Sequence, residues 1–508
     1  MSRISRRSVL GMGVTGLSVS MISPALGSLQ RSKKKPKNII FCVADGMAAS
    51  VPTMVDHLLE IRDGKPSYWR WLMNQDFAVN GLQDTRSLNS VVTDSSAASS
   101  SWGCGRHIWN GMVNMYPDGT KLRTLVQILK EAKMRTGLVT TATITHATPA
   151  GFAVNCLQRD LEGLIAEEYL KAGVDVLIGG GDKFFDPSKR KDGKDLYKEF
   201  KSAGYTICKD RDSILGAKAG KILGIVSNGH VPYTVDRDNS PELQKSTPTL
   251  AEMTKVAIDN LNTGSGGFLL QIEGARVDHA GHGNDFAGMI YDQIAFEEAV
   301  KVAVDFALKD GETLVIITAD HATGGVALNG AGDEYIESTA GLKSVLAMKA
   351  SYDVIFGELG ANPDAKMVQD VIEKRLSIKL TPEEAQAVVD GAKSPFQLST
   401  FKKSKSAVLG MVLGNYSKVG FTSGNHTSDH VLVTAVGPMK ELCHGIVQNT
   451  SFFDIMLAAR DVKVDNPKMT FEDAARHYEK MKSKSDGELF ALYGDPEEEL
   501  EHGYRRLG

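Results

Sequence analysis

The chain has 508 residues, of which 42% are hydrophobic and 24% charged, as in ordinary soluble globular proteins. The formal net charge is −4 and no long basic face is present, which argues against nucleic acid as a partner. Five widely spaced cysteines without a C-x-x-C pair argue against a disulfide framework. This length is ample for a large core and would allow two or three domains.

The first residues carry the features of an export signal. Arg6 and Arg7 stand just before a short stretch, residues 9–26, that is apolar but rich in glycine and serine, and a small-residue cleavage site follows at 25–27. This pattern predicts a twin-arginine signal peptide over residues 1–27 and a periplasmic or extracellular protein. A membrane anchor or a chance pair of arginines is the alternative. No other segment is long and apolar enough to span a bilayer, so we expect no membrane anchor in the mature chain.

The first predicted strand ends in an acidic residue. Residues 38–43 form a continuous apolar run, and Asp45 and Gly46 follow it. Such a run is typical of a parallel strand that is covered on both faces. Open α/β sheets bind their ligands at the carboxyl ends of the strands, so Asp45 is a candidate site residue. The alternative is that Asp45 caps the helix predicted after it.

A serine-rich segment follows the short β-branched run at 91–93. Asp94 and Ser95 end that run, and small residues come after them. The pattern predicts the start of a helix, where free N–H groups and the positive end of the helix dipole favour an anionic group. Ser95 is therefore a candidate nucleophile. A capping Ser or Asp followed by a serine-rich turn is the simpler alternative.

The next predicted strand, residues 136–141, is followed by His146 and Thr148, and Arg159 stands eleven residues beyond Thr148. A His or Thr near a strand end is usually just a satisfied polar group. The guanidinium fork of an arginine, however, suits a phosphate or a carboxylate better than any other side chain. Arg159 is therefore a candidate anion-binding residue.

The densest group of candidate ligands follows the apolar run 267–272. Glu273 ends this run, and Asp278 and His282 stand four residues apart after it. Carboxylate oxygen and imidazole nitrogen are good ligands for a divalent cation such as zinc. Because Glu273 lies on the strand side of the group, it could bind a second, neighbouring cation.

Two further predicted strands are bordered by the same residue types. Asp320 and His321 directly follow the apolar run 313–318, and His426 precedes the strand predicted at 431–436. The inventory of acids, imidazoles, hydroxyls and one arginine is plausible for two or three cations beside a nucleophile and an anion-binding group.

Predicted strands alternate with helices along most of the chain. This alternation predicts an α/β fold, a three-layer α/β/α sandwich with a large, mostly parallel central sheet. Because the polar clusters recur along the whole chain, we expect one catalytic domain over residues 38–465. Residues 344–393 are predicted to form a helical insertion over the site or at a subunit contact, and the charged residues 466–508 a polar C-terminal tail.

Together, these motifs closely resemble those of the alkaline phosphatase family. They occur in the order of that family and cover roughly residues 39–438. The matching motifs are Asp45-Gly46-Met47, Thr93-Asp94-Ser95, His146-Ala147-Thr148-Pro149-Ala150 with Arg159, Pro248-Thr249-Leu250-Ala251-Glu252-Met253, Glu273-Gly274-Ala275-Arg276-Val277-Asp278 with His282, Thr318-Ala319-Asp320-His321, and His426-Thr427-Ser428. The resemblance implies hydrolysis of small-molecule phosphate monoesters through a phosphoserine intermediate, at a site with two Zn²⁺ and one Mg²⁺.

The resemblance also implies a role for each residue of the site. Ser95 would be the nucleophile, with Ser96 as the alternative, Arg159 would hold the phosphate, and Asp94 would orient Arg159. One zinc would be held by Asp278, His282 and His426, the second by Asp320, His321 and Asp45, and the magnesium by Asp45, Thr148 and Glu273. His146 and His279 would lie around the magnesium ligands.

Other functions on the same scaffold remain as alternatives. A sulfatase would need the nucleophile motif C-x-P-x-R, which is absent. A phosphodiesterase would lack the arginine and the residues of the third ion, so Arg159, Thr148 and Glu273 favour monoesters. A non-catalytic exported metal- or phosphate-binding protein would be expected to have lost the nucleophile, whereas Ser95 is present. A homodimer is a further expectation for the assembly.

Overall fold

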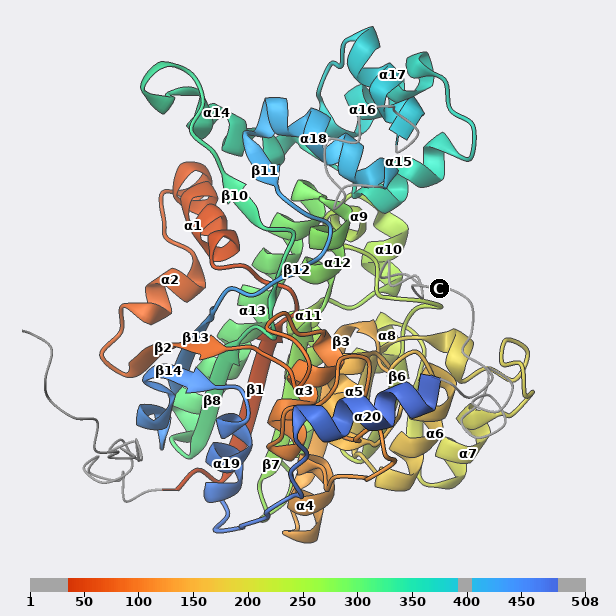
Figure 1. Cartoon of the computed structure of the whole chain (residues 1–508), viewed down its shortest axis with the longest axis vertical. Coiled ribbons are helices and arrows are strands. Elements are labelled where there is room, and N and C mark those ends of the chain that lie inside the picture. The colour runs from red at the N-terminus through yellow and green to blue at the C-terminus, as the bar shows by residue number, and fades with distance from the viewer. Residues whose placement is uncertain (1–34, 392–403, 483–508) are drawn as a thin grey trace, which may run out of the picture. The chain divides into compact units, whose positions relative to one another are not determined.

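A ten-stranded sheet forms the centre of the protein in a computed structural model that describes residues 35–391 and 404–482 (Figure 1). From edge to edge the strands are β14 (Gly445–Gln448), β2 (Ala78–Asp84), β13 (Val431–Val436), β8 (Thr313–Thr318), β1 (Asn38–Ala44), β7 (Phe268–Gly274), β3 (Arg135–Thr143), β4 (Val176–Gly180), β6 (Lys221–Ile225) and β5 (Tyr205–Cys208). Within the described residues, only the pairings of β13 with β2 and β8 in this sheet are antiparallel. The predicted large, mostly parallel sheet is confirmed.

Strand β1 shows why the sheet lies between two layers of helices. All seven of its residues are buried. Successive side chains of a strand point to opposite faces, and the residues of β1 alternate accordingly between two separate apolar cores. Helices α1 (Ser50–Asp63), α11 (Leu250–Leu261) and α13 (Phe286–Asp310) contribute to the first core. Helices α4 (Leu125–Glu131), α6 (Glu162–Ala172), α7 (Leu196–Ser202) and α19 (Ser451–Ala458) contribute to the second.

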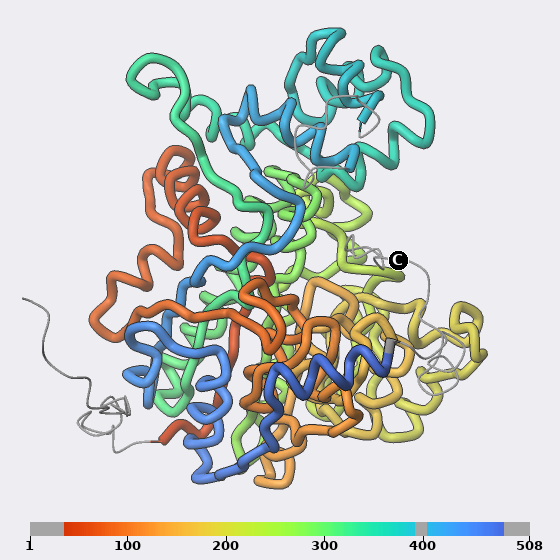
Figure 2. The backbone as a smooth tube through the Cα atoms, viewed as in Figure 1, coloured from red at the N-terminus to blue at the C-terminus, as the bar shows by residue number. Residues whose placement is uncertain are grey.

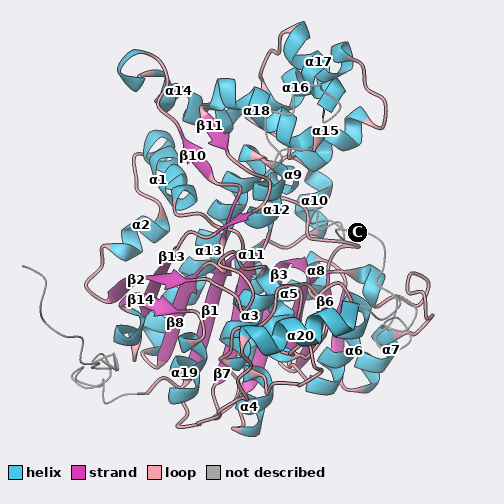
Figure 3. Cartoon of the chain, viewed as in Figure 1, coloured by secondary structure: helices cyan, strands magenta, loops and turns pink. Residues whose placement is uncertain are grey.

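Figure 3 shows the strands between these helices, as the predicted α/β/α sandwich requires. The other helices are α2 (Tyr68–Met73), α3 (Ser95–Cys104), α5 (Ala147–Ala153), α8 (Arg211–Leu215), α9 (Thr234–Asp238), α10 (Pro241–Ser246), α12 (Arg276–Gly283), α14 (Glu337–Lys343), α15 (Tyr352–Leu359), α16 (Ala365–Leu376), α17 (Pro382–Asp390), α18 (Lys405–Ser417) and α20 (Phe471–Lys482). Two small antiparallel sheets pair β9 (Ala322–Thr323) with β12 (His426–Thr427) and β10 (Val326–Leu328) with β11 (Val419–Phe421). None of the described helices meets the length and hydropathy needed to cross a membrane.

The predicted helical insertion contains α15, α16 and α17, which lie beside α18 (Figure 2). Helix α17 starts with a capping box between Thr381 and Glu384 and has Pro382 in its first turn. The insertion contacts the segment that carries the candidate ligands, because Asp353 of α15 forms an ion pair with Arg276 of α12. It therefore borders the candidate site.

The packed part of the chain continues beyond the predicted domain boundary at residue 465. Asn466 is buried, and α20 packs by Tyr478 and Met481 against a small apolar cluster around the loop that follows α3. In Figure 1, α20 crosses the region of α3 and α5. The predicted signal peptide, residues 1–27, and residues 483–508 of the predicted tail lie outside the described residues.

Candidate active site

The candidate acidic ligands meet because three parallel strands end at the same edge of the sheet. Strand β1 lies between β7 and β8, and Val43 of β1 is level with Glu273 on one side and Thr318 on the other. Asp45 and Asp320 each stand two residues past that level. The sheet register therefore brings three acids, distant in sequence, to one place, where α/β sheets bind their ligands.

Ser95 is the first residue of α3, and its side chain is buried. Asp94 caps this helix by accepting a hydrogen bond from the backbone N–H of Ala97. The Oγ atom of Ser95 lies 3.3 Å from Nε2 of His321. By contrast, Ser96 donates to Oδ2 of Asp94 at 2.7 Å. Of these two hydroxyls, the one that contacts a candidate metal ligand is that of Ser95.

A first group of candidate ligands forms around Asp278. Helix α12 places Asp278 and His282 one turn apart, with Oδ2 and Nε2 3.3 Å from each other. His426 and His321 both lie within metal-ligand range of Asp278. Although burial opposes it, the neighbouring His282 holds the pKa of Asp278 well below its usual range, so this carboxylate stays ionised.

The tautomers of His282 and His426 follow from their backbone contacts. Nδ1 of His282 lies 2.7 Å from the carbonyl oxygen of Gly424, and Nδ1 of His426 lies 2.8 Å from that of Thr93. A carbonyl oxygen can only accept, so each Nδ1 carries a proton, and each ring in its neutral form has its lone pair on Nε2. The two Nε2 atoms are 3.0 Å apart. With both rings neutral, two lone pairs face each other at this distance, an arrangement suited to a shared cation.

A second group consists of Asp45, Asp320 and His321, all fully buried and all within metal-ligand range of one another. Oδ1 of Asp320 accepts hydrogen bonds from the backbone N–H groups of Gly46 and His321. Oδ2 of Asp320 is left facing Nε2 of His321 at 3.2 Å. These backbone contacts fix the orientation of the carboxylate, as is usual for residues that bind metals.

The lone pair of His321 can also be assigned. Thr323 donates its hydroxyl proton to Oδ1 of Asp278 at 2.5 Å, so its oxygen must accept from Nδ1 of His321 at 3.2 Å. The lone pair of His321 is therefore on Nε2, which faces Ser95 and the acids. Burial lowers the pKa of His321 well below its usual range and that of His426 to about 4, so both rings are neutral near pH 7.

A third group contains Asp45, Glu273 and His146 within metal-ligand range of one another. Thr148 reaches the same group by donating to Oδ2 of Asp45 at 3.4 Å. His279 lies farther away, with its ring centroid 5.6 Å from that of His146, and Nδ1 of His279 accepts from Arg276. Of the two histidines predicted around the third ion, His146 is thus the nearer to its acids.

Burial of so many acids has an electrostatic consequence. Among the described residues, Oδ1 of Asp45, Oδ2 of Asp320 and both carboxylate oxygens of Glu273 are buried without a hydrogen-bond donor. Burial, and then the charges of neighbouring carboxylates, raise the pKa of Asp45 well above its usual range. Burial raises the pKa of Asp320 and of Glu273 to about 7. Cations would remove this repulsion, so the donor set fits divalent metal ions.

Arg159 is held in place by two side chains. One terminal nitrogen donates to Oδ2 of Asp94 at 3.2 Å, and the other donates to Nε2 of His146 at 3.1 Å. Burial opposes the charge of Arg159, but Asp94 outweighs it and the pKa rises above its usual range. Each terminal nitrogen carries two hydrogens, so one on each remains for a phosphoryl oxygen.

Gly46 allows the closest approach in the site. Its φ of +69° lies in the left-handed region, and a Cβ atom at this position would lie 2.4 Å from Oδ1 of Asp278. Only glycine therefore lets the turn after β1 lie against Asp278 of α12.

Three residues that organise the site were not predicted from the sequence. Thr323 orients Asp278 and His321, and Arg276 holds His279. His230 lies beside both predicted histidines, with its ring centroid 4.4 Å from that of His279 and 5.9 Å from that of His146. His230 comes five residues after β6 ends, so a wider window after each strand end would have included it.

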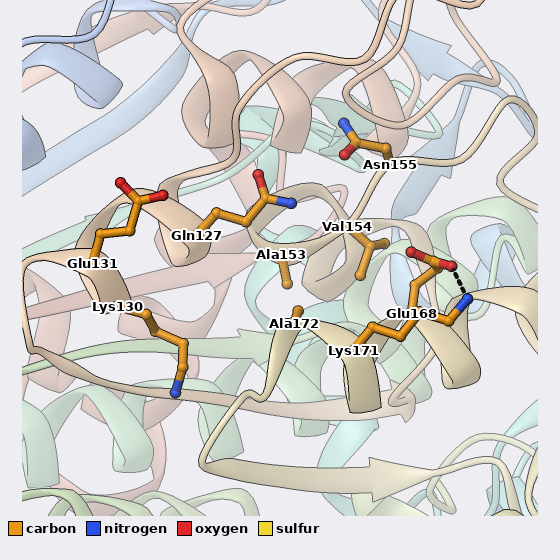
Figure 4. Close-up of a pocket in the computed structure, with 9 residues that line it drawn as sticks. All are labelled: Gln127, Lys130, Glu131, Ala153, Val154, Asn155, Glu168, Lys171 and Ala172. Atoms are coloured by element: carbon orange, nitrogen blue, oxygen red, sulfur yellow. Dashed lines mark hydrogen bonds and ion pairs between the residues drawn. The ribbon is translucent and has the colours of Figure 1, made fainter.

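A separate surface hollow, on the side of α4 and α6, is lined by Gln127, Lys130, Glu131, Ala153, Val154, Asn155, Glu168, Lys171 and Ala172 (Figure 4). Lys171 is paired with Glu168 there, and Lys130 is paired with Asp175 outside the lining. No predicted site residue lines this hollow.

The comparisons with known proteins agree with this geometry. The sequence model of the family described as "Alkaline phosphatase" matches residues 36–462. Alkaline phosphatase 3 of Bacillus subtilis (strain 168) is 34% identical over 452 residues, which cover 85% of this chain and 93% of that protein. Alkaline phosphatase 4 of the same organism is 31% identical over 461 residues, covering 89% and 95% of the two chains. The crystal structure of Thermus thermophilus alkaline phosphatase superimposes with a TM-score of 0.85 at 33% identity and covers 92% of this chain and 100% of that one.

A mostly parallel sheet with groups of candidate metal ligands at the carboxyl ends of its strands is the architecture of a metal-binding enzyme with an α/β fold. The chain belongs to the alkaline phosphatase family, and its activity is the hydrolysis of phosphate monoesters.

Proposed function

We propose that the protein hydrolyses phosphate monoesters through a phosphoserine intermediate on Ser95, at a site that holds two Zn²⁺ and one Mg²⁺. The observation that supports this most strongly is the position of Ser95, whose buried hydroxyl faces the lone pair of His321 among three overlapping groups of candidate ligands. A serine in such surroundings needs no histidine base, because neighbouring cations can lower the pKa of its hydroxyl.

The ligands divide into three sets that share residues. We propose that one zinc is held by Asp278, His282 and His426, the second by Asp320, His321 and Asp45, and the magnesium by Asp45, Thr148 and Glu273, with His146 and His279 around the last set. The shared position of Asp45 is supported by its membership of two groups. When bound, the cations would supply the positive charge that activates the Ser95 hydroxyl and the water and stabilises the leaving alkoxide.

The residues of the chain carry out two displacements in this proposal. Oγ of Ser95 forms a bond to phosphorus as the bond from phosphorus to the alcohol oxygen breaks, and the alcohol takes up the proton. The oxygen of a water molecule then forms a bond to phosphorus as the bond from phosphorus to Oγ breaks, which releases inorganic phosphate, and one proton of that water passes to Ser95. In both steps Arg159 binds two non-bridging oxygens with its remaining hydrogens, and Asp94 keeps the guanidinium in place.

A paired assay tests the reaction class. Purified protein should contain about two zinc and one magnesium per chain by elemental analysis and should hydrolyse p-nitrophenyl phosphate far faster than bis-p-nitrophenyl phosphate. Faster cleavage of the diester would identify a phosphodiesterase instead. Absence of turnover in metal-loaded protein would favour a binding protein.

We also propose that the chain is exported by the twin-arginine route. The support is the arginine pair Arg6-Arg7 before a short apolar stretch. Replacing both arginines by lysine should leave the activity inside the cell, while a fractionation assay of the unchanged chain finds it outside the cytoplasm. Equal export of both proteins would contradict this route.

A further inference from the structure

The side chain of Trp109 is covered by helix α20. The indole ring stacks on Phe471, with ring centroids 6.0 Å apart and planes at 5°, and on Tyr478, with centroids 4.7 Å apart and planes at 29°. Such aromatic contacts contribute more than their buried area alone. Helix α20 starts nine residues after the end of the family match at residue 462. The contact thus joins a segment outside the matched range to a loop inside it.

The residues just before α20 fasten this segment to the same loop, residues 105–123. Nδ2 of Asn466 donates to the carbonyl oxygens of Cys104 and Arg123, at the two ends of the loop. The carbonyl oxygen of Asn466 accepts from Nε of Arg106 at 2.8 Å. The hydroxyl of Tyr116 donates to the carbonyl oxygen of Pro467 at 3.0 Å. The C-terminal segment is therefore bound along the whole length of the loop.

The loop has little regular structure of its own and depends on this cover. Between α3 and α4 the chain forms only turns and isolated bridges. The apolar side chains around the loop form a small cluster that is completed from the C-terminal segment by Met469, Tyr478 and Met481. A small satellite cluster loses much of its buried area when one side is removed, so the conformation of the loop is coupled to α20.

The two residues after Trp109 hold the candidate phosphate-binding group. Gly111 donates its backbone N–H to Oδ2 of Asp94 at 2.9 Å, and its carbonyl oxygen accepts from the backbone N–H of Arg159 at 2.9 Å. Oδ1 of Asn110 accepts from the backbone N–H of Asp94 at 3.2 Å. One short stretch of the loop therefore fixes both the carboxylate that orients the arginine and the backbone of the arginine itself.

We propose that α20 is a positioning element for Arg159, acting through Trp109 and the loop that carries Asn110 and Gly111. This inference rests on the proposed role of Arg159 in binding phosphate. Phe471 and Tyr478 touch no substrate in this scheme. They keep the loop in the conformation in which Asp94 and Arg159 face Ser95, and so they set the affinity of the site for the phosphoryl group.

The test removes the two aromatic rings of α20 that contact Trp109 and leaves every residue of the site intact. In the double variant Phe471→Ala/Tyr478→Ala, the inhibition constant of inorganic phosphate and the KM for p-nitrophenyl phosphate should both rise about three- to tenfold, the scale of a weakened charged hydrogen bond. The same double substitution in an Arg159→Ala chain should change the phosphate inhibition constant less than about twofold, because coupled residues are non-additive. Phe471→Ala alone, a half-exposed position, gives the same comparison should the double variant fold poorly.

Two further variants separate positioning from general destabilisation. Tyr478→Phe keeps the stacked ring and should retain the phosphate inhibition constant of the unchanged chain. Trp71→Ala removes a comparably exposed aromatic residue that packs against Tyr68 of α2 and should also leave phosphate inhibition unchanged. The inference is overturned if the α20 substitutions raise the phosphate inhibition constant equally in chains with and without Arg159. It is also overturned if they leave this constant unchanged while Arg159→Ala raises it. If Arg159→Ala itself had no effect, the proposed phosphate-binding role would fail first.

Discussion

Oγ of Ser95 lies 3.3 Å from Nε2 of His321, although 226 residues separate the two in sequence. Because the hydroxyl of Thr323 fixes the proton of His321 on Nδ1, the lone pair of Nε2 points toward Ser95. A cation bound by that lone pair would lie next to the serine oxygen. This relationship underlies the first prediction.

Ser95→Ala should abolish both turnover and the formation of a phosphoenzyme from labelled phosphate, while zinc content stays unchanged. The matched control is Ser96→Ala, which removes a neighbouring hydroxyl that bonds only to Asp94 among the described contacts and should retain turnover within about tenfold. Rapid-quench labelling with elemental analysis measures both quantities. Turnover in Ser95→Ala like that of the unchanged chain would exclude Ser95 as nucleophile.

Arg159→Ala should weaken the inhibition by inorganic phosphate by about 1.5 to 3 kcal/mol, or roughly ten- to a hundredfold, because two charged hydrogen bonds to the phosphoryl oxygens are lost. Steady-state inhibition assays give the value. Arg190→Ala serves as the control, since Arg190 is also a buried arginine paired with acids but contacts Glu167 and Asp192 away from the site. Unchanged inhibition in Arg159→Ala would mean that another group binds the phosphate.

Removal of the metals should destabilise the fold and not only stop the reaction. Without cations the buried carboxylates of Asp45, Asp320 and Glu273 repel one another. A chelator should lower the melting temperature by about 4 °C for each ion removed, since a ligand at a thousandfold its Kd stabilises by about 4 kcal/mol and the unfolding entropy of a chain of this size is about 1 kcal/mol/K. Differential scanning calorimetry measures the shift.

The matched pair for this experiment is Asp320→Asn against Asp236→Asn. The Asp320→Asn variant should contain less bound metal than the unchanged chain, because the charge of a proposed ligand is removed. Asp236 is also buried, but its oxygens accept from the backbone and hydroxyl of Ser351, so its variant should keep the full metal content. Equal metal content in both variants would contradict the ligand role of Asp320.

Glu297 provides a prediction about pH and stability that is independent of the metals. Burial in α13 raises the pKa of Glu297 from its ordinary value of 4.5 to about 7. A raised folded-state pKa means that the contribution to stability is complete below about pH 4.5 and is lost as the pH rises through about 7. Glu297→Gln keeps an acceptor for the backbone N–H of Trp69. As the pH rises from 5 to 8, its free energy of unfolding should therefore fall by about 2 to 3 kcal/mol less than that of the unchanged chain.

Denaturant unfolding at the two pH values measures this difference. Glu199→Gln, at an exposed position of α7, should follow the unchanged chain at both. If Glu297→Gln also follows it, the carboxyl of Glu297 titrates at an ordinary pKa and the prediction is wrong.

The sequence by itself determined the class of fold and most of the candidate site. Strands covered on both faces must be apolar along their whole length, so β1, β7 and β8 stand out from the helices between them. Parallel strands direct their carboxyl ends to one edge, so the polar residues that follow these strands, such as Asp45 and Asp320, could be assigned to one site from their positions in the chain. The spacing of Asp278 and His282 predicts one helical face for the same local reason.

Only the tertiary structure decided how the remaining residues converge. His426 reaches the first metal group because β12 pairs with β9 in a register that sets it opposite Thr323. The role of Thr323 as the group that fixes the tautomer of His321 likewise depends on contacts between distant segments, and so does the packing of α20 on the loop of residues 105–123. Helical periodicity and capping depend on neighbouring residues and can be recognised in the sequence. Strand register and packing depend on the free energy of the whole chain, which no local pattern determines.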